Sequence, residues 1–347
     1  MKRIVVATSH PLFASGGHLV IANALVKALF DFGYDASLLL TPQNRFGRQG
    51  SAYLATWLTD VAQAHDSRNV DQVISLRFPS YALRHNRHVC WLNHRMREYY
   101  DQWSWFARQL SWPAWMKEGL RRGVIHTVDR YLLTDSVSRV CAQSKTIQAR
   151  LMKWGSIASE VVYPPAPPRP YRCEKYGDYL LVPSRLTTLK RVDMVLDALL
   201  EPEAMAVRCV IVGDGDQRTA LAARVAEYGL SGRVTMTGHV SDSVLVDYFG
   251  KCRAVCVPAV DEDYGLVTVE SFASAKPVIT CNDSGGPSEL VTSGENGLVV
   301  RPEASELAKA IGRMMDDVDL AEQCGQVAYQ QSKSMTWEQT VRQLVLV

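Results

Sequence analysis

The sequence has almost no net charge and no long hydrophobic run. Among its 347 residues, 38 basic and 36 acidic side chains give a formal net charge of +2. This composition does not favour nucleic-acid binding, which usually needs a strong basic excess. No apolar run approaches the roughly 20 residues that span a bilayer, and the run at the amino terminus is too short for a signal peptide. We therefore expect a cytoplasmic protein, either soluble or peripheral at the inner face of the membrane.

A paired-cysteine pattern is also missing. The eight cysteines are scattered, mostly within apolar segments, and no C-x-x-C pair occurs among them. Cys252 and Cys256 lack the second pair of ligands that a structural zinc site would need. The sequence therefore predicts buried free thiols in a reducing compartment and no metal site.

What the sequence does contain is a regular alternation of apolar, strand-like runs with amphipathic helical stretches, in two series. Strands are predicted in the first series at 4–8, 36–40, 72–76, 88–92 and 139–142, and in the second at 179–183, 207–212, 233–237, 254–257, 277–280 and 297–300. Such alternation is typical of parallel sheets covered on both faces. The stretch 164–170 is too rich in proline for a helix or strand and is predicted as a linker. The expected fold is α/β, with two doubly wound, Rossmann-like domains facing across a cleft.

The segment 261–270 places Glu262 and Glu270 at a strand-to-helix junction. The helix is predicted to start at Thr268, with Glu270 in its first turn. In an open α/β sheet this junction lies at the carboxyl edge of the strands, where ligands bind and where a helix start attracts phosphate. Taken alone, Glu270 could equally be a negative charge that the helix dipole stabilises at the start of the helix. The pair, with Gly265 between its members, indicates a place where a phosphate and a polyhydroxylated group lie together.

Two cations, Arg185 and Lys190, flank a short loop after the predicted strand 179–183. A guanidinium offers a planar fork of donors and an ammonium offers a movable point charge, so the pair suits a diphosphate. Solvated surface cations are the common alternative. Their position at the carboxyl end of a strand, in the same domain as the two glutamates, favours ligand binding.

Three further features are less specific. Gly16 and Gly17 lie between a strand and a helix, where they would either admit a ligand to the backbone or form a plain tight turn. The stretch Val212-Gly213-Asp214-Gly215 resembles part of a dinucleotide fingerprint but lacks its third glycine. His94 follows a predicted strand and is either a structural histidine or a contact to a polar substrate.

Together and in this order, the motifs resemble family 4 of the retaining glycosyltransferases, within the glycosyl transferases group 1, whose members have the two-domain GT-B fold. The resemblance covers nearly the whole chain. It is carried by Gly16-Gly17, the spacing of Arg185 and Lys190, Val212-Gly213-Asp214-Gly215, Gly238-His239-Val240, the E-x7-E pair, Gly285-Gly286-Pro287-Ser288-Glu289 and Gly294-Glu295-Asn296-Gly297-Leu298-Val299. It implies an acceptor-side domain at 1–165, a donor-binding domain at 166–334, and a final segment 335–347 that packs back on the first domain. The sequence departs from the usual family residues at His18, Ser184, Arg191, Asp263 and Tyr264.

The resemblance implies a role for each candidate residue of the second domain. Arg185 and Lys190 would bind the donor diphosphate. Glu262 would hold the transferred sugar, and Glu270 the ribose hydroxyls. The backbone of Gly265, Leu266 and Val267 would bind the sugar and phosphate, and Val240 would line the base pocket.

In the first domain the resemblance implies that Gly16 and Gly17 close over the phosphates and that His94 contacts the sugar near its reacting carbon. The implied catalytic residues are Glu262, His94, Arg185 and Lys190. The implied activity is retaining transfer of a hexosyl group from a nucleotide-diphosphate sugar to an acceptor hydroxyl of a glycan or lipid-linked saccharide, in cell-surface polysaccharide synthesis. No cofactor or metal is implied.

Two other functions stay open at this point. One is a nucleotide-sugar epimerase of similar two-domain fold, which would convert a donor with no acceptor present. The other is a non-catalytic subunit that keeps the donor pocket while stabilising a partner transferase. Product analysis and a turnover assay on the isolated chain separate these from a transferase.

The segment 91–122 is unusually aromatic, since it holds five of the eight tryptophans. Apolar side chains recur at helical spacing from Tyr99 to Leu110, and three cations follow between Lys117 and Arg122. Either a helix packs this stripe on its own domain, or the segment forms a surface for a lipid-linked acceptor or for peripheral contact with a membrane.

Overall fold

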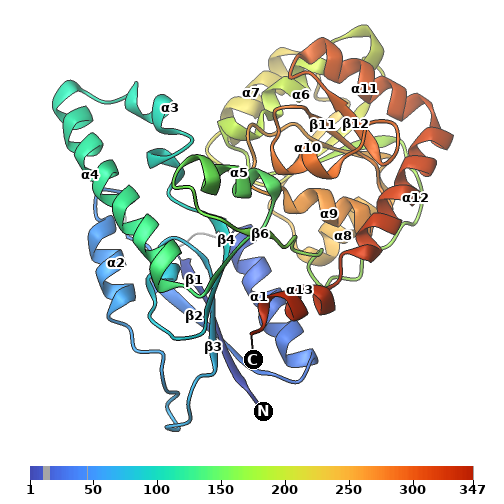
Figure 1. Cartoon of the computed structure of the whole chain (residues 1–347). Coiled ribbons are helices and arrows are strands. Elements are labelled where there is room, and N and C mark those ends of the chain that lie inside the picture. The colour runs from blue at the N-terminus through green and yellow to red at the C-terminus, as the bar shows by residue number, and fades with distance from the viewer. Residues whose placement is uncertain (11–15, 45, 347) are drawn as a thin grey trace. The chain divides into compact units, whose positions relative to one another are not determined.

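The computed structural model describes residues 1–10, 16–44 and 46–346, which divide into two compact units (Figure 1). The first unit consists of Met1–Pro164 and Trp337–Val347, and the second of Pro165–Thr336. Each unit is built on one sheet of six parallel strands with helices between them. The prediction of two doubly wound α/β domains is confirmed.

The sheet of the first unit has the strand order β2-β1-β3-β4-β5-β6. Its strands are β1 (Arg3–His10), β2 (Asp35–Pro42), β3 (Gln72–Arg77), β4 (His88–His94), β5 (Arg139–Ala142) and β6 (Glu160–Val161). The helices are α1 (Gly17–Asp31), α2 (Gln49–Trp57), α3 (Trp103–Ala107), α4 (Trp112–Tyr131), α5 (Lys145–Lys153) and α13 (Trp337–Leu344). Five of these strands were predicted, and β6 was not.

The sheet of the second unit has the strand order β12-β11-β10-β7-β8-β9. Its strands are β7 (Tyr179–Pro183), β8 (Arg208–Val212), β9 (Val234–Gly238), β10 (Ala254–Val257), β11 (Val278–Cys281) and β12 (Gly297–Val300). The helices are α6 (Val192–Ala198), α7 (Arg218–Glu227), α8 (Asp242–Lys251), α9 (Leu266–Ala273), α10 (Gly286–Leu290), α11 (Ala304–Asp316) and α12 (Val318–Ser334).

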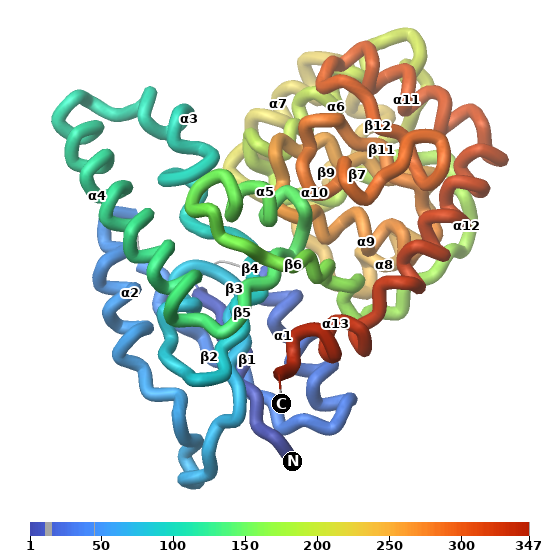
Figure 2. The backbone as a smooth tube through the Cα atoms, in the orientation of Figure 1, coloured from blue at the N-terminus to red at the C-terminus, as the bar shows by residue number. Residues whose placement is uncertain are grey.

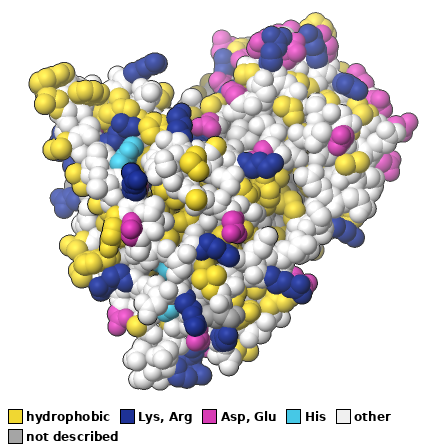
Figure 3. All heavy atoms as spheres, in the orientation of Figure 1, with side chains coloured by type: hydrophobic (Ala, Val, Ile, Leu, Met, Phe, Trp, Pro, Cys, Tyr) yellow, Lys and Arg dark blue, Asp and Glu magenta, His cyan; other side chains and the backbone are white. Residues whose placement is uncertain are grey.

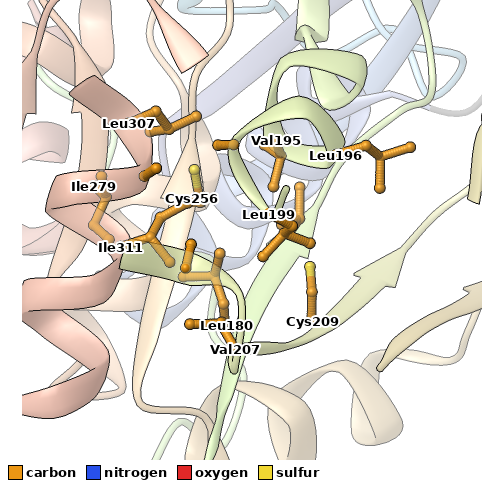
Figure 4. Close-up of a cluster of buried hydrophobic side chains, with 14 of the residues drawn as sticks. Leu180, Val195, Leu196, Leu199, Val207, Cys209, Cys256, Ile279, Leu307 and Ile311 are labelled. Carbon is orange, nitrogen blue, oxygen red and sulfur yellow. The ribbon is translucent and has the colours of Figure 1, made fainter. Parts of the chain in front are cut away.

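Most strand residues are apolar because helices cover the faces of each sheet. In the second unit, Leu180 of β7 and Cys256 of β10 pack with Val195 of α6 and Ile311 of α11, and all four side chains are at most 1% exposed (Figure 4). Fully burying a side chain of this size stabilises a fold by about 1.5–3 kcal/mol. The layered core therefore holds the strand ends, and the loops that leave them, in fixed positions.

The carboxyl-terminal helix α13 belongs to the first unit, although α12 belongs to the second. It lies beside α1 (Figure 2). The side-chain amide of Gln72 donates to the Leu344 carbonyl at 2.7 Å and accepts from the Leu346 amide at 2.8 Å. Trp337 meets Trp91 edge to face. The end of the chain thus packs on the first sheet rather than on the domain that precedes it.

The aromatic segment does not form one helix with a single stripe. It contains a short 3-10 turn at Arg97–Tyr99, then α3 and the start of α4. Tyr99, Trp103 and Phe106 pack against the core of their own unit, whereas Trp105, Trp112 and Trp115 are 62%, 72% and 47% exposed. The first group of aromatic residues therefore packs on its own domain, as one of the two alternatives proposed, whereas the second group does not.

The eight cysteines are free in the described part of the chain, and the prediction that they are buried is confirmed for most of them. Seven of the eight are buried, but Cys173 is exposed. Among the described residues, no helix combines the length and the apolar character needed to cross a membrane.

Candidate functional site

In each sheet, the chain adds strands first on one side of the sheet's first strand and then on its other side. In the second sheet it runs from β7 outward to β8 and β9, and then returns to β10 on the other side of β7. The loops after β7 and β10 therefore diverge, and the crevice at such a switch point is where open α/β sheets bind ligands. Arg185 and Lys190 follow β7, and Glu262 follows β10.

Lys190 and Glu262 form an ion pair between these two loops. Lys190 Nζ lies 2.5 Å from Glu262 Oε2, and their side chains are 20% and 25% exposed. The Val260 amide donates to the Leu189 carbonyl at 2.8 Å, which ties the two loops together. On the first of them, Arg185 is exposed, and within the described residues its guanidinium forms no hydrogen bond or ion pair. The structure thus brings two predicted residues into contact, with a solvent-accessible guanidinium on the same loop.

Arg191, one of the departures from the family pattern, adopts a left-handed backbone conformation with φ of +47°. This conformation costs a non-glycine residue about 1–2 kcal/mol, which explains why glycine is frequent at the position. Here the side chain offsets the cost. Its guanidinium donates to both carboxylate oxygens of Asp283, at 3.0 and 2.6 Å, and to the Pro258 carbonyl at 2.6 Å. Arg191 therefore joins the loops that follow β7, β10 and β11.

The amino terminus of α9 lies at the end of the Glu262 loop. Gly265 precedes it with φ of +79°, and an added Cβ would lie 2.5 Å from Pro287. Since no side chain caps the helix, the amide groups of Leu266 and Val267 in its first turn are available to an anion. The helix begins two residues before the predicted start at Thr268, so the placement of Glu270 in the first turn was wrong. Glu270 lies in the second turn. Its interaction with the helix dipole is weak there and does not explain why a glutamate stands at this position.

Glu270 is a buried carboxylate, 4% exposed. Its Oε1 accepts hydrogen bonds from the Arg169 guanidinium and, at 2.8 Å, from the Tyr171 hydroxyl. Burial raises the pKa of Glu270, and the positive charge of Arg169 opposes that shift. No hydrogen bond to Oε2 is found among the described residues. One oxygen is therefore held in place while the other can accept from a ligand hydroxyl.

The sequence interpretation missed Arg169 and Tyr171. Both lie at the end of the proline-rich linker, and the linker was interpreted only as a spacer. Arg169 also pairs with Asp242 at 2.8 Å, so this end of the linker is fixed to the second unit. A cation near the end of a proline run, with an aromatic residue directly after the run, was the available signal.

His94 is the last residue of β4 in the first unit. Burial and, next, the positive charge of Arg77 lower its pKa to about 3, so its imidazole is neutral at physiological pH. Nδ1 lies 2.7 Å from the Arg95 carbonyl and must donate to it. Nε2 consequently carries the lone pair and can accept a hydrogen bond from a hydroxyl group.

Three other side chains gather near His94, at the switch point of the first sheet between β1 and β3. Arg77 ends β3 and lies opposite His94 in the strand register. His10 ends β1, and His18 is in the first turn of α1. Burial, followed by the charge of Arg77, lowers the pKa of His18 to about 3. The carboxyl-edge rule that selected His94 would also have found Arg77 and His10, because both follow closely on predicted strands, 72–76 and 4–8.

Within the described residues, two buried nitrogens of this cluster lack hydrogen-bond partners. His10 Nδ1 and His18 Nε2 form no hydrogen bond within the described residues. Gly16 precedes α1 in an extended conformation, with φ of −169°, and Gly17 is the first residue of the helix. Ser15, next to this pair, lies outside the described residues. The predicted roles of Gly16, Gly17 and the half-buried Val240, which follows β9, stay predictions.

Comparisons with known proteins identify relatives of the second unit. A family model described as glycosyl transferases group 1 matches residues 172–331. D-inositol 3-phosphate glycosyltransferase of Nocardia farcinica is 34% identical over 171 residues, which cover 46% of this chain and 38% of the relative. Alpha-D-kanosaminyltransferase of Streptomyces kanamyceticus is 30% identical over 162 residues, which cover 45% and 42%. The matched region thus spans less than half the length of these relatives.

Two solved structures are similar over almost the entire chain. Sucrose-phosphate synthase from Thermosynechococcus elongatus has a TM-score of 0.77 at 18% identity, covering 99% of this chain and 97% of that one. Anabaena HepE, solved in complex with UDP and glucose, has a TM-score of 0.71 at 17% identity, covering 98% and 97%. The two six-stranded parallel sheets with their helices match the GT-B fold of such glycosyltransferase structures. Within the second unit, residues 172–331 match the model of the glycosyl transferases group 1.

Proposed function

We propose that the protein transfers a sugar from a nucleoside-diphosphate sugar to an acceptor hydroxyl, with retention of configuration at the anomeric carbon. The observation that carries the proposal is the Lys190–Glu262 ion pair beside the uncapped start of α9, at the switch point of the second sheet. The pair lies inside the region that matches the family model. An acceptor in cell-surface polysaccharide synthesis, either a glycan or a lipid-linked saccharide, is the preferred candidate.

The donor diphosphate would lie against the first amides of α9, between Arg185 and Lys190. As the bond between sugar and phosphate breaks, negative charge grows on the departing oxygen while the sugar becomes oxocarbenium-like. Cations held at that oxygen therefore stabilise the transition state more than the ground state. The acceptor attacks the face from which the phosphate departs, and the diphosphate takes the acceptor's proton. The proposal needs neither an enzyme nucleophile nor a metal ion.

The remaining candidates would position the donor. Glu262 pairs with Lys190 in the structure, and it would turn to the sugar hydroxyls when the diphosphate takes its place. Glu270 Oε2 would accept from the ribose hydroxyls, while Arg169 and Tyr171 hold Oε1. In the first unit, the lone pair on His94 Nε2 would accept from a hydroxyl of the transferred sugar.

Binding and product analysis test the proposal. A thermal-shift screen should find one nucleoside diphosphate among UDP, GDP and ADP that raises the melting temperature; the HepE structure holds UDP, so UDP comes first. Incubation of its sugar conjugate should give a glycosylated acceptor and free nucleoside diphosphate. Conversion of the sugar with no acceptor present would show an epimerase instead. Nucleotide binding with no turnover on any acceptor would show a non-catalytic subunit.

We further propose that α4 rests on an anionic membrane surface. The helix buries two carboxylates, those of Glu118 and Asp129, beside Ile125. Its outward apolar residues are 47–76% exposed: Trp112, Trp115, Met116, Leu120 and Val124. Figure 3 shows hydrophobic side chains at the surface near α3 and the start of α4. Exposed cations, Arg108, Lys117 and Arg130, flank this face. An apolar face with flanking cations is typical of helices that lie in the membrane interface.

Co-sedimentation with phospholipid vesicles tests this contact. We expect the protein to sediment with vesicles containing phosphatidylglycerol and much less with phosphatidylcholine alone. Replacing Trp112 and Leu120 by serine should lower the partition coefficient at least tenfold, since each buried apolar side chain contributes about 1.5–3 kcal/mol. Met205→Ser, at an exposed methionine of the second unit, is the matched control. A protein that stays in the supernatant with anionic vesicles would contradict the proposal.

A further inference from the structure

Arg169, at the end of the proline-rich linker, forms ion pairs with two different helices of the second unit. Its Nη1 donates to Oε1 of Glu270 in α9, and its Nη2 lies 2.8 Å from Oδ1 of Asp242, the first residue of α8. The side chains of Arg169 and Glu270 are 14% and 6% exposed, so solvent ions screen this pair little. The end of the linker therefore supplies the cation of a carboxylate that the proposed function places at the donor ribose.

The chain around Arg169 is anchored along α8. The pair with Asp242 lies at the start of that helix, and the ring of Tyr171 meets Phe249 near its end, edge to face at a centroid distance of 6.5 Å. The Tyr171 hydroxyl donates to Glu270 Oε1 at 2.8 Å. Burial raises the pKa of Tyr171, so this hydroxyl stays protonated. Two donors on an anchored segment thus converge on one oxygen of Glu270.

These contacts control both the orientation and the charge of the Glu270 carboxylate. Because Arg169 and Tyr171 both bind Oε1, the carboxylate is oriented and Oε2 is left to a ligand. Burial raises the pKa of Glu270 and favours its neutral form, whereas the positive charge of Arg169 opposes that shift. An ionised acceptor forms hydrogen bonds roughly twice as strong as those of a neutral one. Arg169 therefore determines how strongly Oε2 can accept from a hydroxyl group.

The same guanidinium also reaches the loop that precedes α8. Asp242 follows Val240 by two residues, and Val240 is the residue expected to line the base pocket. A single arginine therefore connects the carboxylate proposed for the ribose with the chain proposed for the base.

We propose that Arg169 is a positioning residue of the donor site and that, through Glu270, it makes the site select ribose over deoxyribose nucleotides. The inference rests on the proposed function and deepens it, because it assigns the recognition of one part of the donor to the end of the linker. Arg169 acts by holding Glu270 and need not touch the nucleotide. Its removal should weaken the contact with the ribose hydroxyls and leave the cations at the diphosphate, Arg185 and Lys190, unchanged.

Calorimetric titration of the full chain with two nucleotides tests this role. The first is the nucleoside diphosphate that binds best in the thermal-shift screen, and the second is its dideoxy form, which lacks both ribose hydroxyls. The unchanged protein should bind the ribose form about tenfold more tightly or better, as a charge-assisted hydrogen bond predicts. Arg169→Gln should lower this ratio of dissociation constants to about threefold or less, because a neutral acceptor forms a hydrogen bond about half as strong.

The ratio separates positioning from damage to the fold. A damaged linker or domain would weaken the binding of both nucleotides by the same factor and leave the ratio unchanged. Arg169→Lys keeps a positive charge beside Glu270 and should retain more of the ratio than Arg169→Gln. Tyr171→Phe removes the second donor but keeps the ring that meets Phe249, and it should also lower the ratio.

A neighbouring arginine supplies the matched control. Arg172 follows on the same segment, where it pairs with Glu174 and with Asp247 of α8 and, within the described residues, forms no pair with Glu270. Arg172→Gln should leave both dissociation constants unchanged, and a lower ratio in this variant would count against a specific role of Arg169.

The titrations also distinguish this inference from the proposed function. If the unchanged protein binds both nucleotides equally well, or if Arg169→Gln keeps the full ratio, the inference is overturned and the transferase proposal stands. If no nucleoside diphosphate binds to the unchanged protein, the transferase proposal fails together with the inference.

Discussion

Replacing Lys190 by alanine is expected to lower kcat/KM for the nucleotide-sugar donor about 100- to 1,000-fold, the usual effect of removing one preorganised donor from a developing oxyanion. The substitution deletes the cation that forms an ion pair with Glu262 and that would meet the departing diphosphate. Release of nucleoside diphosphate from the nucleotide sugar chosen in the binding screen measures the effect. Glu262→Ala should act in the same direction, and the double variant should lose less than the product of the two single losses, because paired residues are not independent.

A matched lysine supplies the control. Lys309 also pairs with a glutamate, at 2.9 Å from Glu306, but its side chain is 57% exposed and it lies in α11. Lys309→Ala should retain full activity. All variants should keep the melting temperature of the unchanged protein to within a few degrees, because Lys190 is not part of the core. Full activity in both Lys190→Ala and Glu262→Ala would exclude the assignment of this site.

Strand positions in both units followed from the sequence, because buried parallel strands are continuous apolar runs bounded by breakers. The bounds of β7, β10 and β12 agree with the prediction to the residue. The strand β6 escaped because two residues, Glu160 and Val161, show no periodicity. The start of α9 was placed too late because Gly265 was interpreted as part of a turn, whereas its left-handed conformation starts the helix directly.

The candidate site followed from the sequence only in part. The carboxyl-edge rule found Arg185, Lys190, Glu262 and His94, because each follows a strand whose end can be predicted. It could not find a pairing such as Glu270 with Arg169, whose members lie 101 positions apart. Nor could it show that α4 buries two carboxylates and exposes tryptophan and leucine. Helical periodicity identifies an apolar face without telling which face is covered. Tyr99 and Trp112 both belong to one aromatic segment, yet the first is 0% and the second 72% exposed.

The second large effect concerns a carboxylate that α4 buries. We expect a loss of stability when Asp129 is replaced by alanine. Asp129 is fully buried and accepts hydrogen bonds from three tyrosine hydroxyls, those of Tyr53, of Tyr81 at 2.6 Å and of Tyr100 at 2.7 Å. Alanine would leave these hydroxyls buried without their acceptor. Loss of one partner from a buried, charged network costs about 3–5 kcal/mol, and we expect a decrease of that size in the free energy of unfolding of the first unit.

Urea unfolding followed by tryptophan fluorescence isolates this effect, because all eight tryptophans lie in the first unit. Asp129→Asn keeps an acceptor oxygen and should lose less stability than Asp129→Ala. Asp135→Ala, at an exposed aspartate shortly after α4, is the control and should change the free energy of unfolding by less than about 0.5 kcal/mol. Equal midpoints for Asp129→Ala and Asp135→Ala would contradict the prediction.

The same variant also tests whether the two units are independent. The proposed donor residues Arg185, Lys190, Glu262 and Glu270 all lie in the second unit, which contains none of the contacts of Asp129. Asp129→Ala should therefore bind the nucleoside diphosphate with unchanged affinity at temperatures where the first unit is still folded. Its vesicle binding should weaken where the first unit unfolds, because the outward apolar face exists only while the buried carboxylates hold α4 in place. The buried contact of Asp129 with the three tyrosine hydroxyls would then be the reason that α4 can expose tryptophan and leucine at its surface.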